Sequence, residues 1–597
     1  MAWARGSIKT TQGWRRTLIA AVLILVLAVG LWMAWRAWLA PTRVALVHYP
    51  DFQAARLIKA SPGAFTRAEV LPLDRVAQAR RYDLVLLFGR GLKLNDDQLQ
   101  QLRAAGAAGT PVYVDGATNP QHDTLTNLQG ADLDAVAGYL RGGGPANYAR
   151  MQTYARRVLD GKRLFAGAVE APQPMPQDVL FHLGDDAVFA DFDTFEQWRQ
   201  KQPGWKPGRP RLALLTSVPG PFNANRDHVD AVIRAFEARG FEVVPISAVR
   251  QRLAFLKQVD PAAVVYMPHG RLTLGQADEA RQWLSARNIP LFAPVSVFTE
   301  EGEWLADQRS FDGGLLTMSV TLPEIDGATT PMAIAAQFRD DDGLRVFRAL
   351  PARLERFAGL VQRTVALKAK ANADKKLAIY YYKGPGQSAL TTGDLEVVPS
   401  LYALLRRLQS NGYRVEGLPA TEAEFAKLLQ RRGPNIGPYA KGDFASFLRD
   451  GEPAWIQASQ LNGWCGRQIV QLLCDQVARQ FGPAPGAYLS AQGRVAVARV
   501  PLGNVVLLPQ PLPGIGDDTF KLVHGTQLAP PWPYVASYLW TREVFGGDAV
   551  MHFGTHGSLE FTPRKQVALS DRDWPDALIG GLPHVYLYTM GNVGEAM

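Results

Sequence analysis

Two histidines and a glutamate stand close together in the stretch HFGTHGSLEF, residues 552–561. Imidazole and carboxylate groups suit borderline divalent metals such as cobalt, nickel, iron and zinc, and they also suit proton transfer near neutral pH. His552, His556 and Glu560 therefore predict a metal site or a proton-transfer site, and a histidine pair that serves only the structure of a loop is the alternative. The stretch differs from the HExxH pattern of zinc hydrolases, because no glutamate follows His552 directly.

The glycines in this stretch decide which element carries the side chains. The spacing i, i+4, i+8 is that of one helix face, but Gly554 and Gly557 would each cost a helix about 1 kcal/mol relative to alanine. Residues 548–554, DAVMHFG, instead have the apolar run of a buried strand, which a loop THGS follows. Strand ends that run into loops are common places for functional side chains. Four further residues would complete a site only if the fold gathers them: His524, Glu543, His584 and Glu595.

The rest of the chain has the apolar pattern of parallel α/β sheets. Strands separated by helices are predicted from residue 43 onward, again from residue 211, and again from residue 376 after a long helix. This alternation indicates an α/β fold with several doubly wound parallel-sheet domains behind an N-terminal transmembrane helix. A segment rich in proline, glycine and basic residues (200–211) is predicted to be a linker. The predicted domains are residues 1–40, 41–200, 211–348 and 349–597, the last opening with a helical linker.

The N-terminus carries an apolar segment, Thr17 to Trp35, without a charged residue. It is long enough to cross a bilayer as a helix, and three tryptophans, Trp32, Trp35 and Trp38, form an aromatic collar at its end. Bulky Trp38 two residues before Ala40 disfavours the alternative, a cleaved signal peptide. Four basic residues precede the segment and two follow it closely, so we predict a single-pass anchor in the inner membrane with the body on the periplasmic side.

The overall composition excludes several functions. Of the 597 residues, 47% are hydrophobic and 20% are charged, which is typical of folded domains. The net charge of +9 is spread among acidic residues without basic runs, so nucleic-acid binding is not expected. Because neither G-x-G-x-x-G nor a GKS/T motif occurs, no nucleotide is expected to bind this chain. Cys465 and Cys474 are nine residues apart, and we expect two buried free thiols.

Several blocks of the sequence resemble the large subunit of cobaltochelatase (CobN), which belongs with the large, H-type subunit of magnesium chelatase. The most specific are GNVVLLPQPLPGIGDD, YVASYLWTREVFGGDAVMHFGTHGSLEFTPRKQVALS and PDALIGGLPHVYLYTMGNVGEA, residues 503–518, 534–570 and 575–596. Weaker blocks at 313–331 and 375–415 extend the resemblance over about residues 200–597. It implies a subunit that brings a divalent metal (cobalt, magnesium or iron) and a corrin or porphyrin together, both as substrates, as in cobalamin-type tetrapyrrole metabolism.

The resemblance also implies roles for the residues of the opening stretch. Metal insertion requires the removal of two pyrrole N–H protons and a ligand that releases the ion. His552 and His556 would deliver the metal or transfer protons, and Glu560 would act as the base or orient the histidines. His524 and Glu595 would support the tetrapyrrole-binding site.

The sequence departs from the family pattern at several positions. The family's WLPGK reads FTPRK here, so that Phe561, Thr562 and Arg564 replace tryptophan, leucine and glycine. Trp532 stands where the family has a histidine. The chain ends at Met597 inside a matching block, and we expect it to be the N-terminal half of a longer family member.

The predicted topology leaves alternatives open. Chelatases of this type use ATPase partner subunits in the cytoplasm, and a body outside the membrane would have no ATP. The alternatives are therefore a membrane-anchored haem-handling paralogue that removes iron from haem, a non-catalytic tetrapyrrole-binding module, or an inactive fragment.

Overall fold

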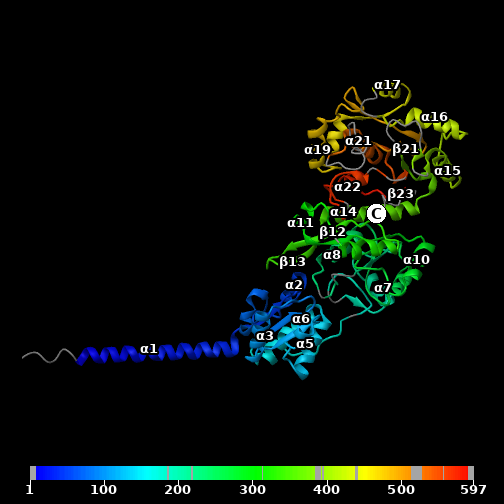
Figure 1. The fold of residues 1–597 in the computed structure, drawn as a ribbon. Coiled ribbons are helices and arrows are strands. Elements are labelled where there is room, and N and C mark those ends of the chain that lie inside the picture. The colour runs from blue at the N-terminus through cyan, green and yellow to red at the C-terminus, as the bar shows by residue number, and fades with distance from the viewer. Residues whose placement is uncertain are drawn as a thin grey trace, which may run out of the picture. The chain divides into compact units, whose positions relative to one another are not determined.

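The computed structural model describes residues 8–588 apart from a few internal segments (Figure 1). The segments outside the description are 176, 185–186, 217–219, 223, 312, 384–390, 393–394, 437–440, 513–527, 555–556, 558 and 566. The chain forms two compact units, each built from separate stretches of sequence. Unit 1 comprises residues 1–195, 219–229 and 338–347, and unit 2 comprises 196–218, 230–337 and 348–597. The division into domains at 200–211 and 348 stays a prediction.

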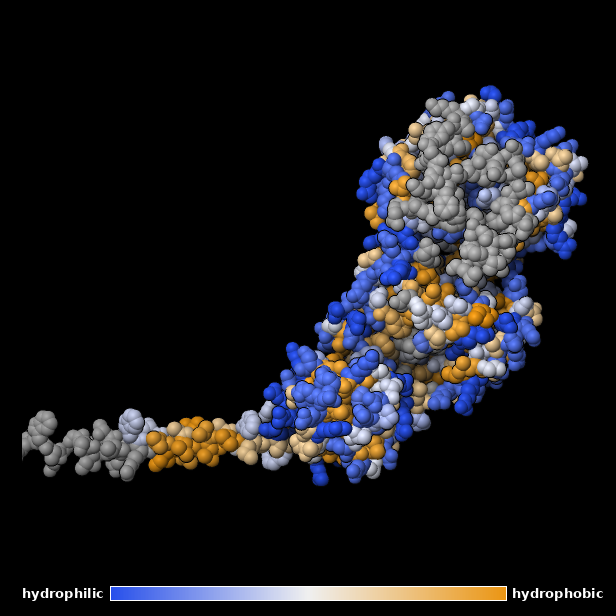
Figure 2. Space-filling view, viewed as in Figure 1, coloured by the Kyte–Doolittle hydropathy of each residue, from blue (hydrophilic) through white to orange (hydrophobic). Residues whose placement is uncertain are grey.

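Unit 1 begins with a long apolar helix. Helix α1 (Ile8–Ala34) continues into the π-helical turn η1 (Trp35–Leu39). Within it, Thr17–Leu39 is long and apolar enough to cross a membrane, and none of its most apolar window is buried in the protein. Figure 2 shows this continuous apolar surface along the helix. Length and composition thus agree with the predicted anchor, which stays a prediction.

The globular part of unit 1 is built on a parallel sheet. Its strands lie in the order β2-β1-β3-β4: Thr66–Val70, Thr42–Val47, Leu84–Phe88 and Val112–Asp115. Between β3 and β4 lies α3 (Asp96–Ala107), which starts at a capping box formed by Asn95 and Gln98. Alternate residues of β1 bury their side chains in two separate clusters, one on each face of the sheet. The parallel arrangement expected from the sequence is therefore confirmed here.

Unit 2 contains two larger parallel arrangements of strands besides several smaller sheets. In the first, four parallel strands lie in the order β10-β9-β7-β8: Leu291–Phe292, Ala263–Tyr266, Arg211–Leu215 and Glu242–Ser247. Helix α14 (Pro351–Ala369) then leads toward the second sheet. That sheet has the order β20-β21-β14-β22-β23: Val500–Leu502, Val505–Pro509, Leu377–Tyr381, Ala549–Gly554 and His584–Tyr588.

The second sheet of unit 2 is parallel except at its edge strand β20, and both of its faces are covered. One face packs with α21 (Trp532–Leu539) and α22 (Trp574–Ile579), and the other packs with α15 (Val397–Ser410). Buried faces on both sides explain the near-continuous apolar runs of these strands. The strand predicted over residues 548–554 is β22, and the fold class predicted from the sequence is confirmed.

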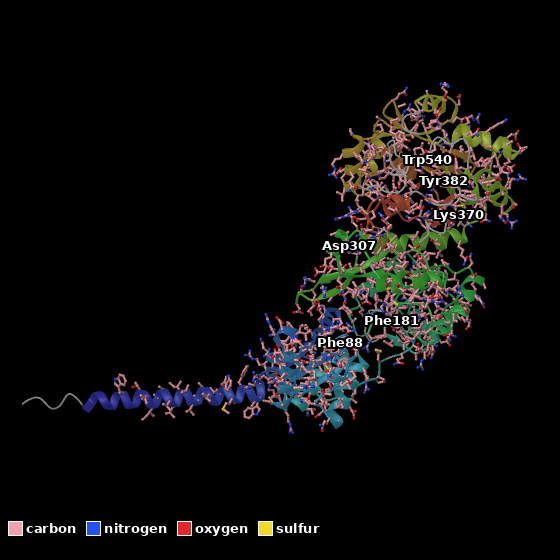
Figure 3. The ribbon with its side chains drawn as sticks, viewed as in Figure 1. Phe88, Phe181, Asp307, Lys370, Tyr382 and Trp540 are labelled. Atoms are coloured by element: carbon pink, nitrogen blue, oxygen red, sulfur yellow. A yellow bond between two sulfur atoms is a disulfide. The ribbon has the colours of Figure 1, made fainter. Side chains whose placement is uncertain are left out.

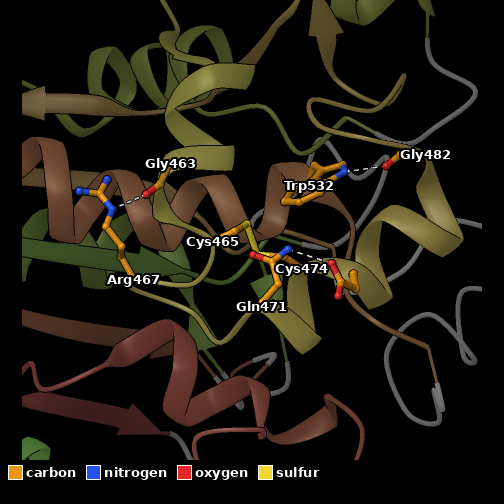
Figure 4. Close-up of a disulfide and its surroundings, with 8 residues drawn as sticks. Gly463, Cys465, Arg467, Gln471, Cys474, Gly482 and Trp532 are labelled. Carbon is orange, nitrogen blue, oxygen red and sulfur yellow. Dashed lines mark hydrogen bonds between the residues drawn. A yellow bond between two sulfur atoms is a disulfide. The ribbon is translucent and has the colours of Figure 1, made fainter.

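The expectation of two free thiols is wrong. Cys465 and Cys474 form a disulfide with their Cα atoms 6.1 Å apart (Figure 4). Helix α18 (Ala458–Trp464) ends just before Cys465, and a tight turn through Gly466 (φ 78°) brings the chain back into α19 (Gln471–Phe481). The turn thus faces Cys465 toward the first turn of α19, where Cys474 lies. A spacing of nine residues did not reveal this pairing because it spans a helix end and a turn.

Candidate functional site

The second sheet of unit 2 places three side chains of the site in one row across neighbouring strands. His552 of β22 is in register with Tyr380 of β14 on one side and with Tyr586 of β23 on the other. Residues in register on parallel strands present their side chains on the same face. His552 lies in the carboxyl-terminal half of β22, whereas Tyr586 is the middle residue of β23 and His584 is its first.

His552 is the centre of a chain of hydrogen bonds. Its side chain is almost wholly buried, with 1% of the residue exposed. Nδ1 of His552 lies 2.5 Å from Nε2 of His584, and Nε2 of His552 lies 2.8 Å from the hydroxyl of Tyr538. Tyr538 reaches the histidine from α21, which covers this face of the sheet. Three side chains from a helix and two strands therefore form one continuous polar connection.

Both histidines are held in the neutral form. Removal from water lowers the pKa of His552 well below its usual value of about 6.5, and the charge of His584 lowers it further. Desolvation also lowers the pKa of His584 to about 4, although part of that residue remains exposed. Neutral imidazoles can accept a proton or ligate a metal ion. The pair is therefore in the protonation state that either task requires.

The hydrogen-bond chain permits two proton arrangements. If His552 carries its proton on Nδ1, it donates to His584 and accepts from the Tyr538 hydroxyl; with the proton on Nε2, both directions reverse. Nδ1 of His584 makes no hydrogen bond to any residue that the structure describes. That nitrogen is the atom of the pair that a ligand can reach.

Tyrosines support the buried end of this chain. The ring of Tyr380 stacks on Tyr538, with centroids 4.5 Å apart and planes 11° from parallel. The Tyr380 hydroxyl lies 2.8 Å from Oγ1 of Thr541 in the π-helical segment η6 (Trp540–Phe545) that continues α21. Burial raises the pKa of Tyr380, so this hydroxyl stays protonated. The packing fixes the position of the Tyr538 hydroxyl against His552.

Glu560 is held beside the histidines by a second set of contacts. It lies in the short 3₁₀ turn η7 (Leu559–Phe561) and accepts hydrogen bonds from the Tyr586 hydroxyl (2.7 Å) and the backbone N–H of Gly557 (2.6 Å). A Cβ atom on Gly557 would lie 2.8 Å from Oε2 of Glu560 and 3.2 Å from the Tyr586 hydroxyl. A larger residue here would therefore displace the Glu560 carboxylate from its present position.

These residues line a cavity of about 540 Å³ in unit 2. Its size lies within the range of about 300–1,000 Å³ that is usual for small-molecule and cofactor sites. Its wall is mostly apolar, with polar groups at a few places, as such sites require. The principal lining residues are Met332, Leu360, His552, Leu559, Glu560, Thr562, Lys565, Leu569, Ile579, Leu582, His584 and Tyr586.

Charged groups around the cavity are mostly engaged with the protein. Asp576 of α22 is buried and forms ion pairs with Arg353 and Arg356 of α14. The ammonium group of Lys565 donates to the backbone carbonyls of Trp304 and Asp307, the latter labelled in Figure 3. These contacts fix the walls. Among the carboxylates that line the cavity, Glu560 is the exposed one.

The structure gathers some of the predicted site residues. His552 and Glu560 both line the cavity, and His584 joins them from β23. Glu543 is exposed in η6 beside Arg542 and is not part of the cavity wall. His556, His524 and Glu595 lie outside the described residues. Among the described residues, no group of three or more histidine, cysteine, aspartate or glutamate side chains has the geometry of a metal site.

Two residues of the site were missed from the sequence. Tyr538 and Tyr586 were not singled out, although each hydrogen-bonds a predicted site residue. The alternation in HVYLY, residues 584–588, is a signal that places His584 and Tyr586 on the same face of a strand. For Tyr538 the sequence carries no comparable signal, because its contact depends on how α21 packs on the sheet.

The departures from the family pattern have distinct structural consequences. Arg564, at a glycine position of the family, has φ 90°, in the left-handed region that favours glycine. An ion pair with Asp573 (3.5 Å) accompanies this conformation. Thr562 is buried in the cavity wall and donates to the carbonyl of Leu559. Trp532 is a buried core residue that donates to the Gly482 carbonyl (2.9 Å) and does not line the cavity (Figure 4).

Together, the parallel sheets and the cavity define an α/β protein with a largely apolar cavity lined by a histidine pair and a carboxylate. The chain belongs to the CobN/magnesium chelatase family, whose model matches residues 137–597. It is 28% identical to the aerobic cobaltochelatase subunit CobN of Pseudomonas aeruginosa over 520 residues, which is 84% of this chain and 40% of that protein. It is 30% identical to the chloroplastic magnesium-chelatase subunit ChlH of Oryza sativa over 413 residues, 65% of this chain and 28% of that protein.

A solved structure has the same fold. The catalytic subunit of cobaltochelatase from Mycobacterium tuberculosis superposes with a TM-score of 0.68 at 22% identity, covering 92% of this chain and 45% of that one. The chain thus spans less than half the length of these relatives.

Proposed function

We propose that this chain is the tetrapyrrole-binding large subunit, or part of it, of a metal chelatase that brings a divalent metal ion and a corrin or porphyrin ring together. Its family membership supports the class of reaction. The observation that carries the assignment to this site is the neutral His552–His584 pair on the wall of a largely apolar cavity. A flat apolar macrocycle suits such a wall, and its central nitrogens need bases and ligands nearby.

The residues divide the chemistry between them. Nδ1 of His584 would contact the metal ion or accept a pyrrole proton, and His552 would pass that proton toward Tyr538 or hold the ring of His584 in place. Glu560 would accept the second proton, with Tyr586 orienting its carboxylate. Cobalt, magnesium and iron are the metals to compare. We propose His556, predicted from the sequence as a further ligand, for metal delivery or proton transfer at the same site.

The test compares two single-histidine variants of the whole chain. His584→Ala removes the outer imidazole, whereas His269→Ala removes an exposed histidine that does not line the cavity. Protoporphyrin IX binding is followed by fluorescence quenching, and uptake of Co²⁺ or Mg²⁺ by the bound ring is followed by its absorbance. We expect His584→Ala to lose at least tenfold in metal uptake and to keep most ring binding. Equal behaviour of both variants would contradict the assignment.

A second candidate function has its own support. The disulfide Cys465–Cys474 is typical of proteins outside the reducing cytoplasm, and the apolar helix Thr17–Leu39 fits an inner-membrane anchor with a periplasmic body. Outside the cytoplasm no ATP is available to drive insertion. The runner-up is therefore a membrane-anchored paralogue that removes iron from haem, with the same groups protonating the pyrrole nitrogens and receiving the metal.

Topology and chemistry separate the two candidates. A reporter fused after residue 60, together with alkylation of free thiols in intact cells, shows on which side of the membrane the body lies. A reporter in the cytoplasm and free thiols would favour the ATP-dependent chelatase with partner ATPase subunits. Incubation with haem and a colorimetric iron chelator then measures iron release. Bound haem that keeps its iron would indicate a non-catalytic binding module.

A further inference from the structure

A buried arginine of unit 1 joins the end of the apolar helix to the globular body. The guanidinium of Arg156 donates to the carbonyls of Trp38 and Ala40 at the end of η1. It also donates to the carbonyl of Phe65, just before β2. Only 1% of Arg156 is exposed. Because a buried arginine satisfies these carbonyls, the end of the helix is part of the folded unit and is not a free tether.

The same arginine holds a segment with an unusually apolar surface. Its Nη2 atom, which donates to the Trp38 carbonyl, also donates to the carbonyl of Leu164 at 2.8 Å. Within residues 158–169, four large apolar residues are between 41% and 69% exposed: Val158, Leu164, Phe165 and Val169. We name residues 158–169 the apolar segment. It lies next to the point where the apolar helix ends.

The conformation of the apolar segment directs Phe165 outward. Phe165 has φ 54°, a backbone region that costs a non-glycine residue about 1–2 kcal/mol, and 69% of the residue is exposed. Its ring stacks on Phe65, with centroids 4.6 Å apart and planes 7° from parallel. Backbone strain that exposes a large aromatic ring is unfavourable in water, and an apolar partner would compensate for it.

The neighbouring residues identify that partner as a lipid surface. Trp35 and Trp38 at the end of the helix are exposed, as are the basic residues Arg157 and Arg163 beside and within the apolar segment. Tryptophan and arginine beside exposed aliphatic and phenylalanine side chains are typical of the membrane interface, where rings lie at headgroup level and cations meet anionic lipid. The apolar segment also lies next to the end of Thr17–Leu39, the only stretch of the described chain that is long and apolar enough to cross a bilayer.

We propose that the apolar segment docks on the bilayer that the N-terminal helix crosses, with Phe165 and Leu164 at the boundary between headgroups and acyl chains. Arg157 and Arg163 would face anionic headgroups. This inference rests on the membrane anchoring proposed above. It adds that the first domain lies against the membrane at a defined face, which sets the orientation of the sheet of unit 1 relative to the lipid.

The test uses a fluorescent label at two positions of the full chain. Because both native cysteines are paired in the disulfide, Phe165→Cys introduces the only free thiol for an environment-sensitive dye. The control is Lys93→Cys. Lys93 is exposed and follows the carboxyl end of β3. The apolar helix leads into the amino end of β1, and β1 and β3 are parallel. Position 93 is therefore at the edge of the sheet opposite to the end of the helix.

Both labelled proteins are reconstituted in vesicles of phosphatidylcholine and phosphatidylglycerol, with and without spin-labelled lipid, and floated on a density gradient. We expect both to float, with the label at 165 blue-shifted and quenched at least twofold more by spin-labelled lipid than the label at 93. Flotation with equal quenching at both positions would overturn the docking and leave the anchor intact. Failure to float would overturn the anchor and the docking together. A blue shift of the label at 165 that increases with the protein-to-lipid ratio, without quenching by spin-labelled lipid, would show that the apolar segment contacts a second copy of the chain. That result would overturn the docking on lipid.

Discussion

Nδ1 of His552 lies 2.5 Å from Nε2 of His584, although the two residues belong to different strands. The contact exists because β22 and β23 are parallel neighbours with His552 opposite Tyr586, which leaves His584 two residues back on the same face. The inner histidine is buried and the outer one reaches the cavity. The pair therefore links the protein core to the space where a ligand would bind, and the site depends on the register of these two strands.

Removal of the Tyr538 hydroxyl tests this link. In Tyr538→Phe, Nε2 of His552 loses its 2.8 Å partner while the ring packing is kept. We expect a loss of about 1–3 kcal/mol in unfolding free energy from the unpaired buried group, together with a change in the His552 tautomer visible in ¹⁵N NMR. Tyr488→Phe, which removes a 2.6 Å hydrogen bond to the Ile436 carbonyl, is the control: it should lower stability without altering the His552 signals. An unchanged tautomer in Tyr538→Phe would contradict the link.

Gly557→Ala tests the space beside Glu560. The new methyl group would lie 2.8 Å from Oε2 of Glu560, so that the carboxylate must move away from Tyr586. We expect porphyrin affinity and metal uptake to fall at least tenfold. Gly302→Ala is the matched control, because Gly302 lies in helix α11 (Glu301–Ala306) with no atom within 4 Å of its new Cβ. That variant should keep full binding and gain up to about 1 kcal/mol in stability.

The strand that carries His552 was predictable from the sequence, whereas the residues that contact His552 were not. The apolar run before His552 and the glycines after it indicate a buried strand that ends in a loop, and β22 has this form. The partnership of His552 with His584 depends on which strands are neighbours and in what register. A single sequence specifies neither, because strand periodicity describes one strand at a time. The contact of Tyr538 with His552 was still harder to predict, because it depends on how a helix packs on the sheet.

Arg564 provides a separate test of backbone strain. Its φ of 90° favours glycine, and the side chain pairs with the buried carboxylate of Asp573. Arg564→Ala removes the ion pair and keeps the strain, whereas Arg564→Gly removes both. We expect the glycine variant to be more stable than the alanine variant by about 1 kcal/mol in urea unfolding. An alanine variant equal to or more stable than glycine would show that this turn is not strained.

Loss of the disulfide should destabilise unit 2. The bond joins Cys465 and Cys474, which are nine residues apart, and for a loop of this size chain entropy predicts a stabilisation of about 2–3 kcal/mol. The double variant Cys465→Ser, Cys474→Ser should therefore unfold at a lower temperature than the parent protein. Dithiothreitol should lower the unfolding temperature of the parent protein and leave that of the double variant unchanged. An equal response of both proteins to the reductant would argue against a stabilising bond.

Acid should weaken unit 1 through a buried histidine. His228 at the start of α8 (Asp227–Ala238) packs against Phe347, and neither ring nitrogen makes a hydrogen bond to the residues that the structure describes. Burial lowers the pKa of His228 to about 3. Below pH 6.5, His228 therefore binds a proton in the unfolded chain but stays neutral in the folded unit. Stability then falls by up to about 1.4 kcal/mol per pH unit between pH 6 and 4. His228→Leu should reduce this pH dependence, so that the variant is increasingly more stable than the parent protein as the pH falls. Hydrogen exchange of β1 peptides in both proteins measures the stability of unit 1. Parallel pH profiles of the two proteins would show that His228 does not cause the loss of stability in acid.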